Sequence, residues 1–583
     1  MLKRLLSAAV AALIALPASG AGATSSGGRL GTSGARELAA RATTAIPSVY
    51  LVGADVQSIN PTPAMIATKS FFLGGYGLSS GNIGNNLIPP PAALPNEVVT
   101  PRAAIGLLGN TDADGHGVHS RTFAIGDGSN VIEFAEIETQ GYFNAYRQGP
   151  YGTEQIRNDA AAAIVAAHKG ATITAAQILV NSVHTHGGPD TVGAWGGVPT
   201  TYLQLIHDRT VAALVNAYNQ MQPAHVQFAT AHAGVIGENV CSTQGAEDLP
   251  CYPADGDGDP LLTNQLAETS QNSGMDDEIR VLQARSVGNN SVIVTFVNYS
   301  SHPTVLGSDN LYVTADYPGV VSDLLTAHYG GIGFDQVATL GRTQPNRANC
   351  SNTAIKGRAM QRCILDEYAA RVFARVKYAL STAPTGGRTN LLLSGKPTVG
   401  LSSYLLFDTS TNPLLNALMV GGAAGGAQIY RAINPPWFTG TEIGTDSYSG
   451  HIGDILISGG PGEMYPQIVA TVRSTVPAAG YINVGTAGDF LGYIISPFGA
   501  YPNVVLATIE DGSDNLLFND SQTLGERLTC SLLRGAGDTL AANPMLYWST
   551  RKTCALFVTD FETPQGFDTS FPEQPNLSSI YTH

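Results

Sequence analysis

The sequence predicts an α/β fold in which mixed β-sheets with flanking helices form a single large domain. Of the 583 residues, 43% are hydrophobic, enough for a full core and not typical of a disordered chain. Short β-rich runs alternate with helical segments, and no internal repeat is present. The length alone would also allow two or three ordinary domains.

Strands are expected where β-branched and other apolar residues form short runs, and helices where apolar residues recur with helical spacing. The expected strands are 51–56, 122–125, 131–137, 177–183, 281–284, 292–297 and 455–457. The expected helices are 155–168, 202–221 and 368–380. Residues 288–290, Gly-Asn-Asn, predict a turn that pairs strands 281–284 and 292–297.

The first 23 residues have the pattern of a secretory signal peptide. A basic start at Lys3 and Arg4 is followed by an apolar run at 5–16 and an Ala-x-Ala site at 21–23. The apolar run is shorter than the ~20 residues that cross a bilayer, although an uncleaved anchor is an alternative. We therefore expect a secreted, extracellular protein with a flexible leader at 24–48, one domain at 49–583 and no transmembrane segment.

The charge and cysteine content agree with export. The formal net charge of −15 and the absence of a Lys/Arg cluster argue against binding to nucleic acid. An even number of cysteines in an exported chain favours disulfides. Neighbouring positions suggest three pairs, although six cysteines allow fifteen pairings. The suggested pairs are Cys241–Cys251, Cys350–Cys363 and Cys530–Cys554.

Residues 400–440 contain apolar clusters followed by a Gly-rich run at 421–426. One interpretation is an apolar flap with a glycine hinge beside a lipid-like substrate. The other, which we favour, is a buried helix followed by a loop.

The strongest chemical signal is the pair His184 and His186. Residues two apart on a strand face the same side, so both imidazoles point one way at the end of strand 177–183. The following glycines and Pro189 end the strand, and active sites of α/β sheets usually form at that end. The pair suits one metal ligand plus one group acting on a substrate. A structural pair bonded to backbone carbonyls is the alternative.

Three other residues stand at similar places. His302 follows strand 292–297 directly before Pro303, Glu463 follows strand 455–457, and Tyr493 lies in a Gly-rich segment. Each also has an ordinary interpretation, as a satisfied histidine, a solvated glutamate or a core tyrosine. Their spacing in the sequence cannot show that they meet.

Residues 181–190 resemble the His-Thr-His-Ser-Gly-Pro motif of the neutral/alkaline ceramidases. Further motifs of that family follow in the same order at 276–282, 301–303, 461–463 and 492–494. The resemblance covers roughly residues 49–497. It implies one Zn²⁺ held by His184, His302, Glu463 and Tyr493, a ligand set that suits zinc, with His186 as a hydrogen-bond donor beside it.

The resemblance further implies a zinc-dependent hydrolase that cleaves the amide bond of an N-acylated, lipid-like compound with zinc-activated water. Such a substrate allows transient contact with a membrane surface. Asp316 and Tyr501 would shape the pocket, although a turn cap and a packed ring are their ordinary alternatives.

The chain departs from the family at three points. Gln344 stands where the family has a pocket serine, and an amide cannot become an alkoxide nucleophile. The family's substrate-facing arginine has no clear counterpart near 237–241. After Tyr493 too few residues remain for the family's appended immunoglobulin-like domain, so none is expected.

Two weaker signals give other hypotheses. Ser79 lies in a Gly-x-Ser-x-Gly run, as in serine esterases, but a Gly-rich loop is the better interpretation. The acidic runs 255–259 and 112–115 have the oxygen spacing of a structural Ca²⁺ or Mg²⁺ site, without the distal glutamate of an EF-hand. A secreted binding protein without catalysis is a third hypothesis.

Overall fold

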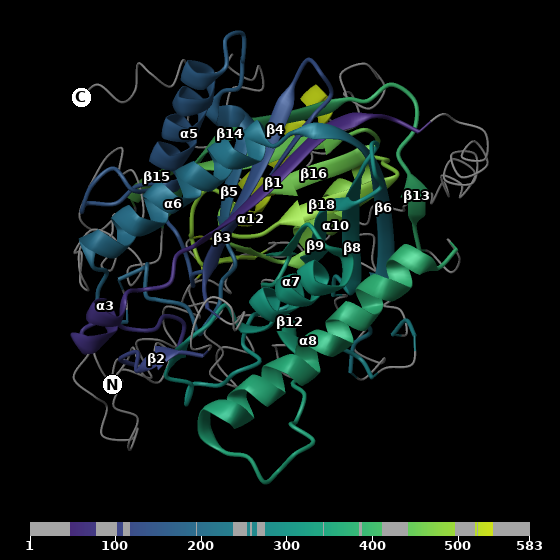
Figure 1. Cartoon of the computed structure of the whole chain (residues 1–583). Coiled ribbons are helices and arrows are strands. Elements are labelled where there is room, and N and C mark those ends of the chain that lie inside the picture. The colour runs from purple at the N-terminus through teal and green to yellow at the C-terminus, as the bar shows by residue number, and fades with distance from the viewer. Residues whose placement is uncertain are drawn as a thin grey trace, which may run out of the picture.

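In the computed structural model of the chain, the described residues centre on a mixed sheet of nine strands (Figure 1). The structure describes residues 47–76, 102–108, 117–193, 195–236, 254–256, 259–264, 275–341, 343–383, 388–410, 441–495, 519, 521 and 523–539. The strand order is β11 (Ile332–Val337), β9 (Val292–Tyr299), β8 (Glu278–Ser286), β6 (Gln222–His232), β1 (Tyr50–Ser58), β3 (His119–Gly126), β4 (Val131–Ile137) and β5 (Ile178–Ser182). A short strand, β13 (Asn390–Leu392), also pairs with β6.

The sheet is strongly curled, so strands far apart in its order come into contact. Phe123 of β3 meets Phe296 of β9 and Phe334 of β11, with ring centroids 5.4 and 5.7 Å apart. The Nε2 of Gln336 in β11 donates to Asn181 in β5 at 2.8 Å, which joins the two edge strands. A twist of about 20–25° at each strand pair accumulates over the pairs between β9 and β5 and turns their carboxyl ends toward each other.

A second sheet packs against the first. It consists of β14 (Val399–Ser410), β15 (Thr441–Ile452), β16 (Ile455–Gly459) and β18 (Gly480–Val484), with β16 and β18 parallel. Apolar residues of both sheets form one core cluster, because alternate side chains of each strand face inward. The cluster includes Val52, Phe123, Phe134, Phe296, Val399, Tyr448, Ile457 and Val484.

Three two-stranded pairs lie beside these sheets. They are β2 (Gly106–Leu107) with β10 (Tyr312–Val313), β7 (Leu262–Asn264) with β12 (Thr343–Pro345), and β17 (Glu463–Met464) with β19 (Tyr493–Ile494).

Helices cover the outer faces of both sheets, which gives four layers in the order helix, sheet, sheet, helix (Figure 1). The described helices are α3 (Pro63–Ala67), α5 (Thr153–Ala167), the 3-10 helix η3 (Ala175–Gln177), α6 (Thr200–Asn219), α7 (Asp316–Tyr329), α8 (Gly357–Ser381), α10 (Pro466–Thr475) and α12 (Leu524–Thr539). α5 and α6 share a core cluster with β4 and β5, α7 and α8 share one with β8 and β9, and α10 and α12 pack on the second sheet.

The predicted α/β class with mixed sheets is confirmed, and so are most of the elements expected from periodicity. The predicted turn at 288–290 joins β8 and β9 as an antiparallel pair, with Asn290 at φ 59°. α8 starts well before the expected helix at 368–380. The expectation of a helix within 400–440 is wrong for its first part, because 400–410 belongs to β14 and pairs with β15 along its length. Residues 411–440, which include the glycine hinge, lie outside the described residues.

One predicted disulfide, Cys350–Cys363, is confirmed. Cys530 is buried in α12, while Cys241, Cys251 and Cys554 lie outside the described residues, so their pairing stays a prediction. The described chain begins at 47, which leaves the signal peptide and most of the leader outside it. Among the described helices, none combines the length and hydropathy that a membrane span requires.

Candidate metal centre

His184 stands two residues beyond the end of β5, where the backbone leaves the sheet. Its φ of 63° is left-handed and ends the extended run. The side chain is 2% exposed, and its Nδ1–H donates to the carbonyl of Gln140 at 2.8 Å. A proton held on Nδ1 leaves the lone pair on Nε2, which is the arrangement of a metal-binding histidine.

His302 is positioned in the same manner three residues after β9. Its Nδ1 donates to the carbonyl of Thr343 at 2.6 Å, so its Nε2 also carries a free lone pair. The backbone N–H of His186 donates to the carbonyl of Pro303 at 3.2 Å, which ties the loop after β5 to the loop after β9. The two histidine loops are therefore held against each other by main-chain contacts.

Glu463 begins β17, which follows β16 of the second sheet along the chain. After β16 the chain passes Gly462 and enters β17, where Glu463 pairs in register with Tyr493 of β19. A β-carbon on Gly462 would stand 2.4 Å from the carbonyl oxygen of Gly492, so glycine is required for this close approach. The register sets the carboxylate and the phenol side by side.

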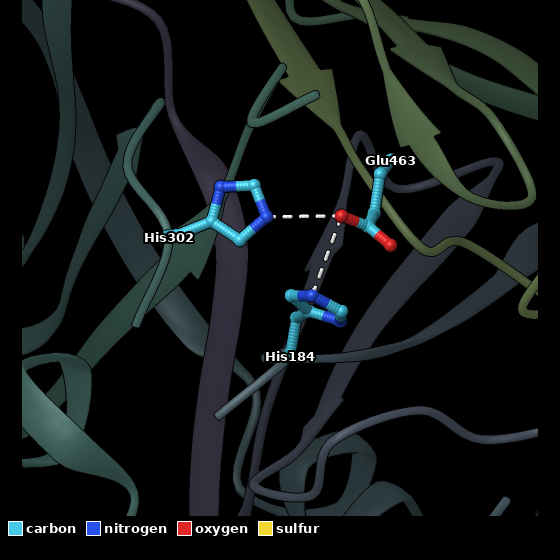
Figure 2. Close-up of side chains that lie close together, drawn as sticks. All are labelled: His184, His302 and Glu463. Carbon is cyan, nitrogen blue, oxygen red and sulfur yellow. Dashed lines mark hydrogen bonds and ion pairs between the residues drawn. The ribbon is translucent and has the colours of Figure 1, made fainter. Parts of the chain in front are cut away.

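These side chains converge on one point (Figure 2). Nε2 of His302 lies 2.9 Å and Nε2 of His184 lies 3.4 Å from Oε2 of Glu463. One ligand atom from each of the three residues lies within 4.8 Å of the others. The phenol of Tyr493 hydrogen-bonds the Glu463 carboxylate. The four predicted ligands are thus together, although they are spread over about 300 positions of the sequence.

The ionisation of this group suits a cation. Burial lowers the pKa of His184 to about 4, so its imidazole is neutral at pH 7. Burial alone would raise the pKa of Glu463, but the adjacent imidazoles of His184 and His302 outweigh it and hold the carboxyl below its usual pKa. A neutral imidazole at His184 and an ionised carboxyl at Glu463 are protonation states that metal binding requires. The donor set of nitrogen and oxygen atoms fits zinc.

His186 lies beside His184, and its own contacts differ from those of the candidate metal ligands. Its Nε2 is 3.2 Å from Nε2 of His184, and because that atom carries a lone pair, the proton is on His186. Its Nδ1 is buried and has no partner among the described residues. The ring packs edge-on against Tyr76 with centroids 4.8 Å apart. His186 therefore directs an N–H toward the centre.

Arg102 holds this side of the centre together. Its guanidinium donates to the carbonyls of Asn310 at 2.9 Å, His186 at 2.8 Å and Gly74, which belong to three separate segments. It also lies over the ring of Tyr76, 4.8 Å from the centroid. Burial lowers the pKa of Arg102 to about 10, so it is charged at neutral pH.

The remaining predicted site residues lie nearby or outside the described part of the chain. Asp316, at φ 59°, accepts the backbone N–H groups of Val305, Leu306 and Tyr317, so it caps the turn that follows His302.

Gln344 lies on β12, and its side-chain oxygen accepts a hydrogen bond from the hydroxyl of Thr304 at 2.6 Å. Thr304 stands two residues after His302 in the sequence. Tyr501 and Ser79 lie outside the described residues. In the acidic run 255–259, the carboxylate of Asp255 accepts a hydrogen bond from Arg388 at 2.6 Å and another from the backbone N–H of His232. The acidic run 112–115 lies outside the described residues.

Sequence reasoning missed Arg102, Tyr76 and the two carbonyl acceptors of Gln140 and Thr343. A backbone carbonyl gives no signal in a sequence, and a single arginine after a proline gives hardly any. The Gly-Gly-Tyr run at 74–76 was the signal available in the sequence. In the structure its second glycine has φ 90° and lies against the His186 ring.

The fold and the site define an α/β protein with a buried His/His/Glu group compatible with one metal ion. Comparison with solved structures shows which fold this is. The crystal structure of neutral ceramidase from Pseudomonas aeruginosa matches with a TM-score of 0.53 and 14% identity, over 88% of this chain and 75% of that one. A ceramidase complexed with C2 matches with a TM-score of 0.54 and 13% identity, over 86% of this chain and 76% of that one.

The chain therefore has a divergent neutral ceramidase-like fold, which confirms the resemblance at the level of structure. No protein-family profile and no curated protein sequence matches it.

Proposed function

We propose that the chain is a secreted, zinc-dependent amidohydrolase that cleaves the amide bond of an N-acylated, lipid-like compound. The observation that carries the proposal is the convergence of His184, His302 and Glu463 from three strand ends, with each imidazole held in the ligand tautomer by a carbonyl. The two ceramidase structures of the same fold support an amide as the bond and a lipid-like acyl group as part of the substrate.

The ligands proposed for zinc are His184, His302, Glu463 and Tyr493, which matches a site of nitrogen and oxygen donors. When bound, zinc supplies Lewis acidity that lowers the pKa of water from 15.7 to about 7 and polarises a carbonyl. The hydrogen bond from Tyr493 orients the carboxylate, and ligand orientation of this kind tunes a metal site.

His186 supplies the hydrogen bond for the reacting carbonyl. Its Nε2–H points to the centre, at the place where negative charge develops on the substrate oxygen during attack. Burial lowers the pKa of His186, so it acts as a neutral donor. Gln344, whose carbonyl oxygen already accepts from Thr304, offers its amide hydrogens to a polar group of the substrate.

The test combines metal analysis with hydrolysis of N-acyl compounds. The purified protein should contain about one zinc per chain and release fatty acid from an N-acylated amine, and a chelator should abolish the release. His184→Ala and Glu463→Ala should lose both metal and activity, while His328→Ala, an exposed histidine of α7, should keep both. Full activity in the two ligand variants would falsify the proposal.

The location is tested separately. The predicted cleavage after Ala23 and the Cys350–Cys363 disulfide support an exported protein, since disulfides form in oxidising compartments. The mature protein should be found outside the cell with Thr24 as its first residue. An intracellular protein that keeps Met1 contradicts the proposed location and leaves the proposed chemistry in place.

A further inference from the structure

Buried residues with amide side chains connect the two sheets close to the strand ends that lead to the candidate metal ligands. Each of them is at most 2% exposed, and each stands on a different strand, β5, β9, β11 or β18. They are Asn181, Asn298, Gln336 and Asn483. Buried amides of this kind have to find hydrogen-bond partners, so their bonds show which segments they hold together.

The amide of Asn298 joins β9 to the edge of the second sheet. Its Nδ2 donates to the carbonyl of Asn483 at 2.8 Å, and its Oδ1 accepts the backbone N–H of Asn483 at 3.0 Å. β18 is the last strand in the order of the second sheet, so this side chain pairs with its backbone as a neighbouring strand would. The same Nδ2 lies 3.3 Å from the carbonyl of Gln336 on β11.

The turn that carries Glu463 is fixed to the end of β18. The backbone N–H of Gly460, three residues before Glu463, donates to the carbonyl of Val484 at 3.0 Å. Asn298 itself stands four residues before His302. Its amide therefore connects, through β18, the strand that precedes His302 with the turn that precedes Glu463.

Gln336 makes the corresponding connection to His184. Its Nε2 donates at 2.8 Å to Oδ1 of Asn181, which stands three residues before His184. On the other side, Gln336 of β11 is in register with Asn298 of β9. The three segments that carry the candidate ligands are thus joined through the side chains of Gln336 and Asn298.

Stability alone does not account for the amide of Gln336. Its Oε1 is buried and has no hydrogen-bond partner among the described residues, which costs free energy. A methionine of similar length would lose one hydrogen bond and would also remove this unpaired oxygen, so the two effects on stability largely offset each other. The methionine could not reproduce the fixed distance and direction that a hydrogen bond imposes on two strands.

We infer that Gln336 and Asn298 are positioning residues of the candidate metal centre, because they fix the separation of the segments that carry His184, His302 and Glu463. The inference rests on the proposed function, since it concerns the zinc site proposed there. Zinc holds nitrogen and oxygen ligands at about 2.0–2.2 Å, so a small shift between these segments weakens its binding.

The test compares zinc affinity with stability. Gln336→Met should lower zinc affinity, measured against a chromophoric chelator, about tenfold, while its urea midpoint stays near that of the parent protein. Thr122→Val is the matched control, because it removes a buried hydrogen bond to the carbonyl of Ala213 at 2.9 Å that ties β3 to α6. This control should lower the urea midpoint and keep the zinc affinity of the parent.

Cobalt reports the ligand geometry without turnover. The visible absorption of bound Co²⁺ depends on the arrangement of its ligands, so Gln336→Met should shift it and Thr122→Val should not. Asn298→Leu removes both hydrogen bonds to Asn483 and should lower zinc affinity at least as much as Gln336→Met. If Asn298→Leu does not fold, the comparison of Gln336→Met with Thr122→Val still decides the question.

The outcomes separate the two claims. A zinc affinity and a cobalt spectrum equal to those of the parent protein in Gln336→Met overturn the inference and leave the proposed function standing. An equal loss of zinc affinity in Thr122→Val also overturns it, because the loss would then follow stability and not the position of the ligands. A parent protein that binds neither zinc nor cobalt overturns the proposed metal centre together with the inference.

Discussion

Removing the Asp316 carboxylate should destabilise the protein and weaken its metal site. Its two oxygens accept the N–H groups of Val305, Leu306 and Tyr317 at 3.1, 3.0 and 2.8 Å, and all of these groups are buried. Each buried donor left without a partner costs about 1–3 kcal/mol. Alanine at φ 59° adds about 1 kcal/mol of backbone strain.

Asp316→Ala should therefore lower the free energy of unfolding by at least about 3 kcal/mol. Asp316→Asn keeps one acceptor oxygen and tolerates the left-handed backbone, so it should cost about 1–3 kcal/mol. Asp309→Asn, an exposed change three residues beyond Leu306, should stay within about 0.5 kcal/mol of the parent. Urea unfolding at constant m-value measures all three variants.

The same change should reach the metal, because the turn that Asp316 caps begins at His302. In the folded Asp316→Asn variant, zinc affinity measured against a chromophoric chelator should fall about 10- to 100-fold, as for other groups that orient metal ligands. If Asp316→Ala is as stable as Asp309→Asn, the hydrogen-bond argument is refuted. If Asp316→Asn loses stability and keeps its zinc affinity, the positioning argument is refuted.

Three further changes test other contacts. In Gly75→Ala, the new β-carbon would stand 2.4 Å from Cγ of His186 at a φ of 90°, so kcat/KM should fall at least about tenfold with zinc retained, and unchanged kinetics would exclude this contact. Tyr493→Phe removes the hydrogen bond to the carboxylate ligand and should weaken zinc binding about 10- to 100-fold; equal zinc titrations would contradict the proposed ligand set. Cys350→Ser opens the bridge to Cys363, which closes a short loop, and should cost about 3 kcal/mol in urea unfolding; a variant as stable as the parent protein would contradict this contribution.

The sequence by itself determined the features that depend on neighbouring residues. Alternation and helical spacing predicted β4, β9, α5 and α6, because these patterns reflect which face of a single element is buried. The Gly-Asn-Asn turn predicted the β8–β9 pair, because it needs only a left-handed residue such as Asn290. The direction of both imidazoles at the end of β5 followed from the period of a strand.

Prediction from local sequence patterns failed where the same residues are compatible with more than one kind of secondary structure. Residues 400–410 are apolar enough for a buried helix or a strand, and pairing with β15 decides for the strand. α7 was missed because it begins at Asp316 in a left-handed conformation, which its tertiary hydrogen bonds to the His302 turn support.

Tertiary structure alone decided the site. Side chains at His184, His302 and Glu463 come together only because the first sheet twists until the ends of β5 and β9 meet and the second sheet brings β16 to the same place. The carbonyls that fix the two tautomers, and the three carbonyls that Arg102 joins, belong to the backbone and have no residue type to reveal them. Such contacts depend on how distant segments pack against each other. No local pattern of residue types in the sequence reports that packing.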